Sequence, residues 1–277
     1  QRKPSPESLQ NIDLVLFDIQ DVGVRFYTYI ATLQLVMQAC GAADIPLFVL
    51  DRPNPNSSYV DGPTMEKAHQ SFLGMTPIPL VYGMTIGEYA SMVNTEEDWL
   101  GTDKHPALSV VGLKNYNREV SYSIPIRPSP NLPNDQSIAL YPSLGLFEGT
   151  TINAGRGTEA QFTRFGAPEL SNKMPFSYTP RPNFGAKYPK HNGEICYGQD
   201  LSEITPPKSV NLTWLIDAYT NSAKKEAFFI TSGFTKHAGN DKLQKQIEAG
   251  MTAAEIRKTW QKDLDTFKAI RAKYLRY

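Results

Sequence analysis

Residues 14–29 read LVLFDIQDVGVRFYTY, and this stretch decides the fold class. Its first residues form a short, continuously apolar run, which predicts a buried strand over Leu14–Asp18. Apolar residues at helical spacing follow and predict a helix over residues 24–40. Because a buried strand followed by a helix is the first half of a βαβ unit, we expect an α/β protein.

The same alternation continues through the first half of the chain. A second apolar strand is expected at Pro46–Leu50, a helix from Thr85 to Asn94, and a third strand at Leu108–Leu113. Continuous apolar strands separated by helices predict a parallel sheet that is covered on both faces.

The second half of the chain has a different pattern. Residues 150–277 are rich in proline and glycine and contain short β-type runs, namely CYGQDL (196–201), SVNLTW (209–214) and AFFITSG (227–233). A clear amphipathic helix is expected from Ala253 to Tyr274. We therefore expect a smaller α+β or barrel-like domain over residues 150–277, after an α/β domain over residues 1–149.

Composition argues against several classes of protein. Hydrophobic residues make up 40% of the 277 residues, so a sizeable core is expected. The 28 basic residues equal the 28 acidic residues, which leaves no electrostatic basis for binding nucleic acid. No apolar run approaches the roughly 18 residues of a membrane span. Nothing in the sequence indicates an oligomeric state.

Metal and cofactor motifs are weak or missing. The histidines and cysteines are scattered, without HExxH or CxxC spacing, so we expect no metal site. Gly155–Ala160 matches GxGxxA, but a dinucleotide fingerprint needs a strand before it and a helix after it. Because this match lies outside the alternating half, we expect no cofactor and disfavour a dinucleotide-dependent oxidoreductase.

Polar side chains follow the first two expected strands. The carboxyl ends of parallel strands are where open α/β sheets bind ligands, so these side chains are candidate site residues. The alternative is that the acids cap the helices that follow, and Asp21 fits that role best. The site candidates are Asp18, Gln20, Asp51, Arg52 and Asn54.

Two further glutamates and one arginine are candidates. Glu148 follows an apolar helical segment and could be a general acid, or simply an exposed glutamate at a helix end. Thr85 and Glu88 form a capping-box pattern that recurs at Thr252-Ala-Ala-Glu255, although Gly87 suggests a close approach near Glu88. Arg156 lies between two glycines, where its guanidinium could hold a carboxylate.

Several long motifs occur in an order that resembles one bacterial family. They are FDIQDVGVRFYTYI, VLDRPNP, DGP, PIPLVYGMTIGEYA, PSPNLP, LFEGTTINAGRGTEAQF, FGAP and KYLRY. Together they resemble the NamZ-like exo-β-N-acetylmuramidases, formerly a family of unknown function. The resemblance extends from about Pro4 to Tyr277, so it covers essentially the whole chain.

The resemblance implies a Rossmann-like domain, a barrel-like C-terminal domain and an active site in the cleft between them. It implies a glycosidase that releases N-acetylmuramic acid from the non-reducing end of peptidoglycan fragments. Its partners would be peptidoglycan-derived sugars or muropeptides. Family members are usually exported, so we expect a periplasmic or extracellular protein, although no signal segment is present in this sequence.

One departure from the family pattern concerns the N-terminal side. Family members have a further region before the segment that matches Ser5–Asp13. It supplies the first strands and a Glu-His-Gly motif, which does not occur in this sequence. We therefore expect this chain to lack part of the catalytic machinery. The alternative is a non-catalytic protein that binds muropeptides or glycans.

The resemblance also suggests roles for the candidate residues. The in-chain catalytic carboxylates would be Glu148, Glu88 and Asp18. Arg25 or Arg156 would pair with the lactyl carboxylate of muramic acid. The remaining sugar-binding candidates are Gln20, Asp51, Arg52, Asn54, Asn131 and Asn153.

Overall fold

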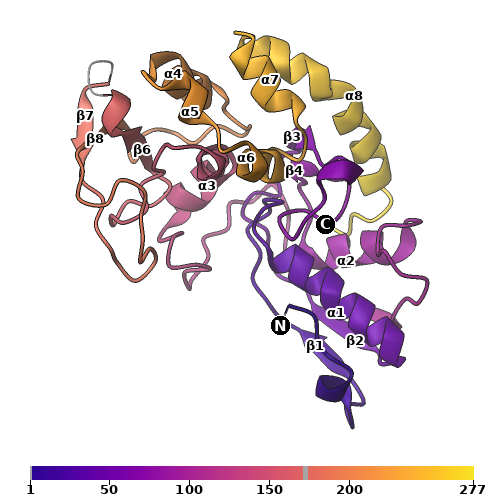
Figure 1. Cartoon of the computed structure of the whole chain (residues 1–277). Coiled ribbons are helices and arrows are strands. Elements are labelled where there is room, and N and C mark those ends of the chain that lie inside the picture. The colour runs from indigo at the N-terminus through magenta and orange to yellow at the C-terminus, as the bar shows by residue number, and fades with distance from the viewer. Residues whose placement is uncertain (1, 171–173) are drawn as a thin grey trace. The chain divides into compact units, whose positions relative to one another are not determined.

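The computed structural model describes residues 2–170 and 174–277 (Figure 1). The chain divides into two compact units. Unit 1 consists of Gln1–Val60, Thr64–Tyr122 and Lys262–Tyr277, and unit 2 consists of Asp61–Pro63 and Ser123–Gln261. By residue contacts the division therefore lies at 122/123, and the domain boundary expected at 149/150 stays a prediction.

Unit 1 is built on a parallel sheet in the order β1-β2-β5. The strands are β1 (Val15–Phe17), β2 (Leu47–Leu50) and β5 (Leu108–Val111). Val15 pairs with Leu47, which in turn pairs with Leu108. The predicted strands and the α/β class are therefore confirmed.

Helices α1 (Tyr29–Ala43) and α2 (Ile86–Thr95) supply most of the core of unit 1. Leu33 and Met37 of α1 and Tyr89 and Val93 of α2 are fully buried with the sheet residues. Leu16, in contrast, is 60% exposed. The continuous apolar strands predicted a sheet covered on both faces, but one face is partly exposed in this chain.

The start of α1 differs from the prediction. The helix was expected from residue 24, but it begins at Tyr29. Val24 instead forms an antiparallel bridge with Val81 of β4 (Pro79–Val81), and Arg25 N donates to Leu80 O at 2.8 Å. The apolar spacing before Tyr29 is therefore that of an extended segment. Because the helix begins so late, the prediction that Asp21 caps it is wrong.

Unit 2 contains an antiparallel sheet in the order β6-β8-β7. Its strands are β6 (Arg164–Ala167), β7 (Phe176–Tyr178) and β8 (Cys196–Asp200). β8 matches the predicted CYGQDL strand, and the α+β character of this half is confirmed.

The other two expected strands of unit 2 are wrong. SVNLTW leads into α4 (Thr213–Asn221), and AFFITSG spans the end of α5 (Lys225–Phe228) and the start of α6 (Thr231–Ala238). A short apolar run fits a buried helix as well as a strand. Here the rings of Phe228 and Phe234 both contact Phe229, so the run is part of a buried aromatic cluster between helices.

A close backbone approach in unit 2 fixes the position of residue 148. Helix α3 (Asp135–Leu144) runs into the 3₁₀ helix η3 (Gly145–Gly149), and α6 packs on η3. A Cβ atom at Gly149 would lie 2.4 Å from Cα of Phe234, so only glycine permits this contact. Glu148 is therefore attached to a tightly packed part of unit 2.

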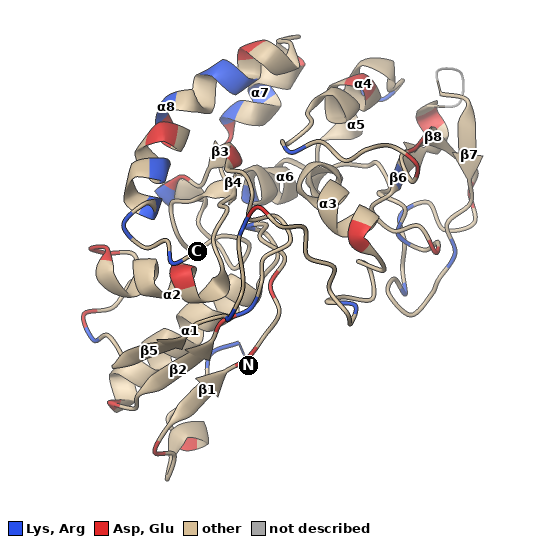
Figure 2. Cartoon of the chain, turned by 180° about the vertical axis from the view of Figure 1, so that it is seen from behind, with Lys and Arg blue, Asp and Glu red and all other residues tan. Residues whose placement is uncertain are grey.

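The last long helix is α8 (Ala253–Arg271), close to the predicted range, and the predicted capping box of Thr252 and Glu255 is confirmed. Lysines, arginines and acids occur along the whole helix (Figure 2), and most of these charged residues are exposed. Its residues up to Gln261 belong to unit 2, and those from Lys262 belong to unit 1.

Among the described residues, no helix is both long and apolar enough to cross a membrane. The remaining elements are η1 (Glu7–Leu9), β3 (Asp61–Thr64), η2 (Lys67–His69), η4 (Pro168–Leu170) and α7 (Lys242–Glu248).

Candidate functional site

The carboxyl ends of β1 and β2 carry a half-exposed ion pair. Arg52 Nε donates to Asp18 Oδ1 at 2.6 Å, and the hydrogen bond to Asp18 raises the pKa of Arg52. The structure thus brings together the two strand ends that the sequence singled out. Both side chains keep exposed surface, so both can contact a ligand.

Two amides near this ion pair have structural partners. Gln20 Nε2 donates to the carbonyl oxygens of Asp21 (2.8 Å) and Pro53 (2.7 Å). Asn54 is buried, and its Nδ2 donates to Met84 O at 2.7 Å. These contacts hold the loops after β1 and β2 in place. Gln20 is half-buried, so it is more accessible to a ligand than the buried Asn54.

Asp51 is buried at the end of β2. Its Oδ1 accepts from Gly87 N at 2.8 Å, and its Oδ2 accepts from Thr85 Oγ1 (2.8 Å) and Tyr277 OH (2.9 Å). Burial raises the pKa of Asp51, although these hydrogen bonds oppose the rise. A Cβ at Gly87 would lie 2.7 Å from Asp51 Cγ, which explains the glycine in the first turn of α2.

Glu88 is fully buried beside Asp51. It completes the predicted capping box, because its Oε2 accepts from Thr85 N at 2.9 Å. Its Oε1 accepts from Arg118 Nη2 and Arg276 N, both at 2.7 Å. Each oxygen of Glu88 therefore has a partner within unit 1, and a catalytic role for this residue stays a prediction that the geometry does not favour.

Two charged residues of the quoted stretch are also buried. Arg25 is fully buried, and its Nη1 donates to Ile78 O at 2.9 Å. Burial lowers its pKa to about 9. Asp21 accepts from Gly23 N at 2.7 Å and from Tyr82 OH, and burial raises its pKa to about 6. Both residues lie in the interior of unit 1, so a lactyl carboxylate could not reach Arg25 without a local opening.

Unit 2 contains a second ion pair of predicted residues. Arg156 Nη1 donates to Glu148 Oε2 at 2.6 Å, and the side chains are 35% and 23% exposed, respectively. A carboxyl group beside a guanidinium, both partly open to solvent, is a typical arrangement for binding or reacting with a polar ligand.

The glycines on either side of Arg156 are required by the backbone. Gly155 and Gly157 have φ angles of +75° and +82°. A Cβ at Gly155 would lie 2.4 Å from Ala160 O, and one at Gly157 would lie 2.7 Å from Pro189. The loop has neither a strand before it nor a helix after it, which agrees with its rejection as a dinucleotide fingerprint.

Asn153 supports this loop from inside unit 2. Its Nδ2 donates to Arg156 O (3.0 Å) and Lys190 O (2.9 Å), and its Oδ1 accepts from Tyr178 OH at 3.0 Å. It is 1% exposed. Asn153 therefore orients the arginine loop, whereas the sequence had suggested that it binds sugar directly.

Lys190 is a residue of this site that sequence reasoning missed. Its ammonium donates to four backbone carbonyls, those of Phe147 (2.9 Å), Glu148 (3.2 Å), Thr150 (2.6 Å) and Ile152 (3.2 Å). Burial lowers its pKa to about 8, while the charge of Glu148 opposes this shift. Lys190 fixes the path of residues 147–152. Only its position in a KYPKH cluster could have drawn attention to it.

Asn131 joins the same region through Gly185. Its Nδ2 donates to Gly185 O at 2.8 Å, and Arg156 Nη2 lies 3.4 Å from the same oxygen. The structure therefore gathers Glu148, Arg156, Asn153 and Asn131 in unit 2. The other seven candidates all lie in unit 1.

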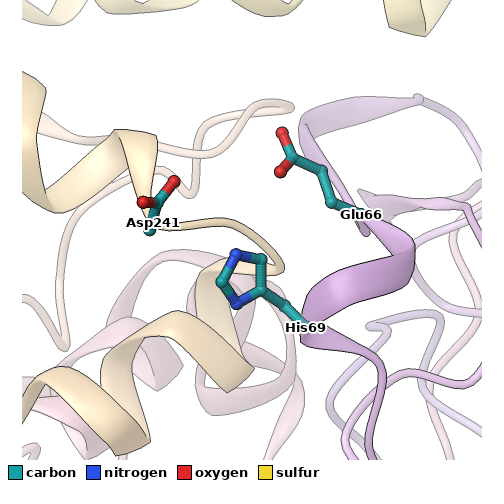
Figure 3. Close-up of side chains that lie close together, drawn as sticks. All are labelled: Glu66, His69 and Asp241. Carbon is teal, nitrogen blue, oxygen red and sulfur yellow. The ribbon is translucent and has the colours of Figure 1, made fainter.

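Among residues 2–170 and 174–277, metal-ligating side chains do not gather within either unit alone. Figure 3 shows Glu66 and His69, which lie next to each other at η2 of unit 1, where His69 N donates to Glu66 O at 2.9 Å. It also shows Asp241, which precedes α7 in unit 2 and pairs with Lys245. Among the described residues of each unit taken alone, no three ligands have the spacing of a metal site.

The comparisons with known proteins agree with the sequence motifs. Two family models match the chain, "Exo-beta-N-acetylmuramidase NamZ, N-terminal" over residues 1–136 and "Exo-beta-N-acetylmuramidase NamZ, C-terminal" over residues 139–277. A similar curated protein is the peptidoglycan beta-N-acetylmuramidase NamZ of Bacillus subtilis (strain 168). It is 38% identical over the whole of this chain, which spans 70% of that protein.

Two crystal structures of Bacteroides fragilis NCTC 9343 proteins are also similar, and both are described as DUF1343 family proteins. BF0379 is 43% identical with a TM-score of 0.95, and the match covers 99% of this chain and 78% of that one. BF0371 is 26% identical with a TM-score of 0.83, and the match covers 100% of this chain and 78% of that one.

Proposed function

Because the chain belongs to the NamZ family of exo-β-N-acetylmuramidases, we propose that it is a glycosidase acting on peptidoglycan fragments. It would release N-acetylmuramic acid from their non-reducing ends by hydrolysis of the β-glycosidic bond. The similarity to the B. subtilis protein over the full length of this chain supports the proposal. The single structural observation that carries it is the partly exposed pair of Glu148 and Arg156.

Glu148 is the carboxylate of unit 2 that we assign to the chemistry. Glycoside hydrolysis generally uses a carboxyl group as acid and a carboxylate as base, nucleophile or stabiliser of the oxocarbenium-like transition state. Glu148 accepts a hydrogen bond from Arg156 Nη1 at 2.6 Å, and this position suits the second group of roles. Lys190 and Asn153 hold its backbone and the loop of its partner Arg156 in place.

Arg156 is assigned to the substrate's own acid. Its side chain is 35% exposed, and a guanidinium offers five N–H donors, of which one binds Glu148 and one binds Gly185 O. The second N–H groups of Nη1 and Nη2 can bind the lactyl carboxylate, which distinguishes muramic acid from glucosamine. A site with this arginine should reject sugars that lack the lactyl group, because the arginine would lose a partner.

Asp18, Arg52 and Gln20 are assigned to sugar hydroxyls or the acetamido group. They are the sequence candidates of unit 1 that keep accessible surface, unlike the fully buried Arg25 and Glu88. Asp51 and Asn54 would support the same strand ends from the interior.

The test is incubation of the protein with defined MurNAc–GlcNAc oligomers, followed by mass spectrometry of the products. Free N-acetylmuramic acid from the non-reducing end is the expected product. Glu148→Gln is expected to lower kcat at least about 100-fold, since acid–base and nucleophilic groups contribute about 10²–10⁴-fold. Asp135→Asn, an exposed carboxylate at the start of α3, serves as the control and should be unaffected.

Binding without product release would contradict the proposal. Calorimetry with the MurNAc–GlcNAc disaccharide would then identify a glycan-binding protein, the alternative that the sequence left open. Normal turnover in Glu148→Gln would retain the activity but refute the assignment of this residue.

We also propose that the protein is exported and has a role in cell-wall recycling. The support is chemical, because peptidoglycan lies outside the cytoplasmic membrane and its fragments arise there. Fractionation of the source cells, with immunodetection of the protein, tests this. Detection in the cytoplasmic fraction alone would contradict it.

A further inference from the structure

Unit 2 has a small pocket next to the pair of Glu148 and Arg156. Its volume is about 250 Å³, and its lining includes Arg127, Glu159, Gln161, Phe184 and Gly185. Pockets for drug-sized ligands are larger, about 300–1,000 Å³, so this one suits a single sugar ring. Gly185 connects it to the ion pair, because its carbonyl oxygen lies 3.4 Å from Arg156 Nη2.

The most unusual residue of the pocket is Phe184. Its side chain is 92% exposed, although a large apolar ring ordinarily gains by burial. An exposed aromatic ring beside polar groups is a surface on which the C–H face of a sugar can pack.

The turn that carries Phe184 is held rigidly. Asn183 and Ala186 exchange backbone hydrogen bonds of 3.0 and 3.2 Å, and Asn183 Oδ1 accepts from Gly185 N at 3.1 Å. Asn183 Nδ2 ties the turn to Thr158 O at 3.1 Å. On its other side, Asn131 binds Gly185 O at 2.8 Å. The backbone that carries the exposed ring is thus held in place, which lowers the entropy lost when a ligand binds.

A buried amide supplies an independent indication of a ligand. Gln161 is 3% exposed, and its Oε1 has no hydrogen-bond partner among the described residues. Buried polar atoms almost always have one, so this oxygen lacks a donor. Sugar hydroxyl and acetamido N–H groups are such donors, and Arg127 and Glu159 add charged groups at the exposed rim.

We propose that this pocket binds the N-acetylglucosamine residue on the leaving-group side of the scissile bond, with its ring packed against Phe184. The inference rests on the proposed function, which requires a second sugar next to the muramic acid. It explains why the exposed ring of Phe184, the unpaired oxygen of Gln161 and a hydrogen-bonded turn occur together. Gly185, the residue after Phe184, contacts Arg156 of the ion pair.

The test compares two substrates in four proteins: the native chain, Phe184→Ala, Phe184→Trp and Tyr188→Ala. One substrate is the MurNAc–GlcNAc disaccharide, and the other is β-MurNAc fluoride, which has no second sugar. The ratio of kcat/KM for the disaccharide to that for the fluoride should fall about tenfold in Phe184→Ala, as expected for loss of an aromatic contact. Phe184→Trp should restore it.

Tyr188→Ala is the matched control, because Tyr188 is 95% exposed in the same segment and does not line the pocket. It should leave the ratio within about twofold of the native value, the usual scatter for a surface substitution. An unchanged ratio in Phe184→Ala would overturn the subsite while leaving the proposed function intact.

A second measurement does not depend on turnover. Saturation-transfer NMR with the methyl β-glycoside of N-acetylglucosamine should show contact with the native protein and loss of that contact in Phe184→Ala. If the native protein cleaves neither substrate, the proposed function is wrong, and the NMR result alone decides on the sugar pocket. An equal NMR signal in both proteins, or none in either, would contradict the pocket.

Discussion

Arg156 Nη1 donates a hydrogen bond of 2.6 Å to Glu148 Oε2. The carboxyl group belongs to η3, and the arginine lies between two glycines in the sequence. The two groups are partly exposed, and Lys190 and Asn153 fix the backbone on either side of them. This pair is the centre of the proposed chemistry, so its disruption gives the most direct predictions.

Replacement of Arg156 by methionine should impair catalysis more than folding. A hydrogen bond to a charged group contributes about 1.5–3 kcal/mol, so its loss should lower kcat/KM for the disaccharide about 10- to 100-fold. Steady-state kinetics measures this. Arg181→Met, at an exposed arginine in the same unit, is the control and should behave as the native protein. Full activity in Arg156→Met would refute the role of the pair.

Replacement of Glu88 by glutamine should destabilise unit 1. Glu88 is fully buried and paired at 2.7 Å with Arg118, whose side chain is 13% exposed, so the substitution leaves a largely buried positive charge without its counter-ion. We expect the free energy of unfolding to fall by about 3–5 kcal/mol. Urea denaturation measures this. Glu255→Gln is matched to it, because Glu255 completes an exposed capping box of the same sequence type, and should have a much smaller effect. Loss of turnover with unchanged stability would instead indicate a catalytic role.

Replacement of Asp21 by asparagine should change the pH dependence of stability. Burial raises the pKa of Asp21 from 3.8 to about 6, so the folded protein binds this proton more tightly than the unfolded chain does. The free energy of unfolding therefore falls as the pH rises from about 4 to 6, by up to roughly 3 kcal/mol from this group. Urea denaturation between pH 4 and pH 7 should show a flatter dependence in Asp21→Asn. A dependence identical to that of the native protein would contradict the buried carboxyl.

Replacement of Lys190 by methionine should affect both stability and turnover. Four carbonyl oxygens would lose their shared donor, and we expect the free energy of unfolding to fall by about 1–3 kcal/mol. Turnover should fall as well, because residues 147–152 would no longer hold Glu148 in place. Thermal melts and disaccharide kinetics measure the two effects.

Lys187→Met is the control for Lys190, since Lys187 is an exposed lysine of the same segment. Lys190→Arg retains the charge and should recover part of the stability. If Lys190→Met lost stability but kept the native kcat, Lys190 would be a structural residue without a positioning role.

The strands and α2 of unit 1 could be predicted because their patterns are local. Continuous apolar runs marked β1, β2 and β5, and the Thr85–Glu88 box marked the start of α2. The start of α1 could not be predicted, because residues before it pair with β4, more than fifty residues further along the chain. The helices in AFFITSG were missed because a short aromatic run has the same pattern in a buried helix as in a strand.

The site was predictable only in part, for a similar reason. The glycines on either side of Arg156 have positive φ angles. Because such backbone angles favour glycine, the Gly-Arg-Gly pattern indicated in the sequence that Arg156 was a candidate site residue. Lys190 had no such signal, because its role depends on four carbonyls about forty residues away. The burial of Arg25 and Glu88 could not be predicted from the sequence either, because it depends on tertiary packing.

The division of the chain has a consequence for the order of events during synthesis. Unit 1 includes residues 262–277, and Arg276 and Tyr277 contact Glu88 and Asp51. A ribosome makes all of unit 2 before it makes these residues. The buried carboxylates Asp51 and Glu88 therefore gain these partners only after α8 and the residues that follow it have been made. Every residue of unit 2 is therefore made before the contacts of unit 1 can be completed.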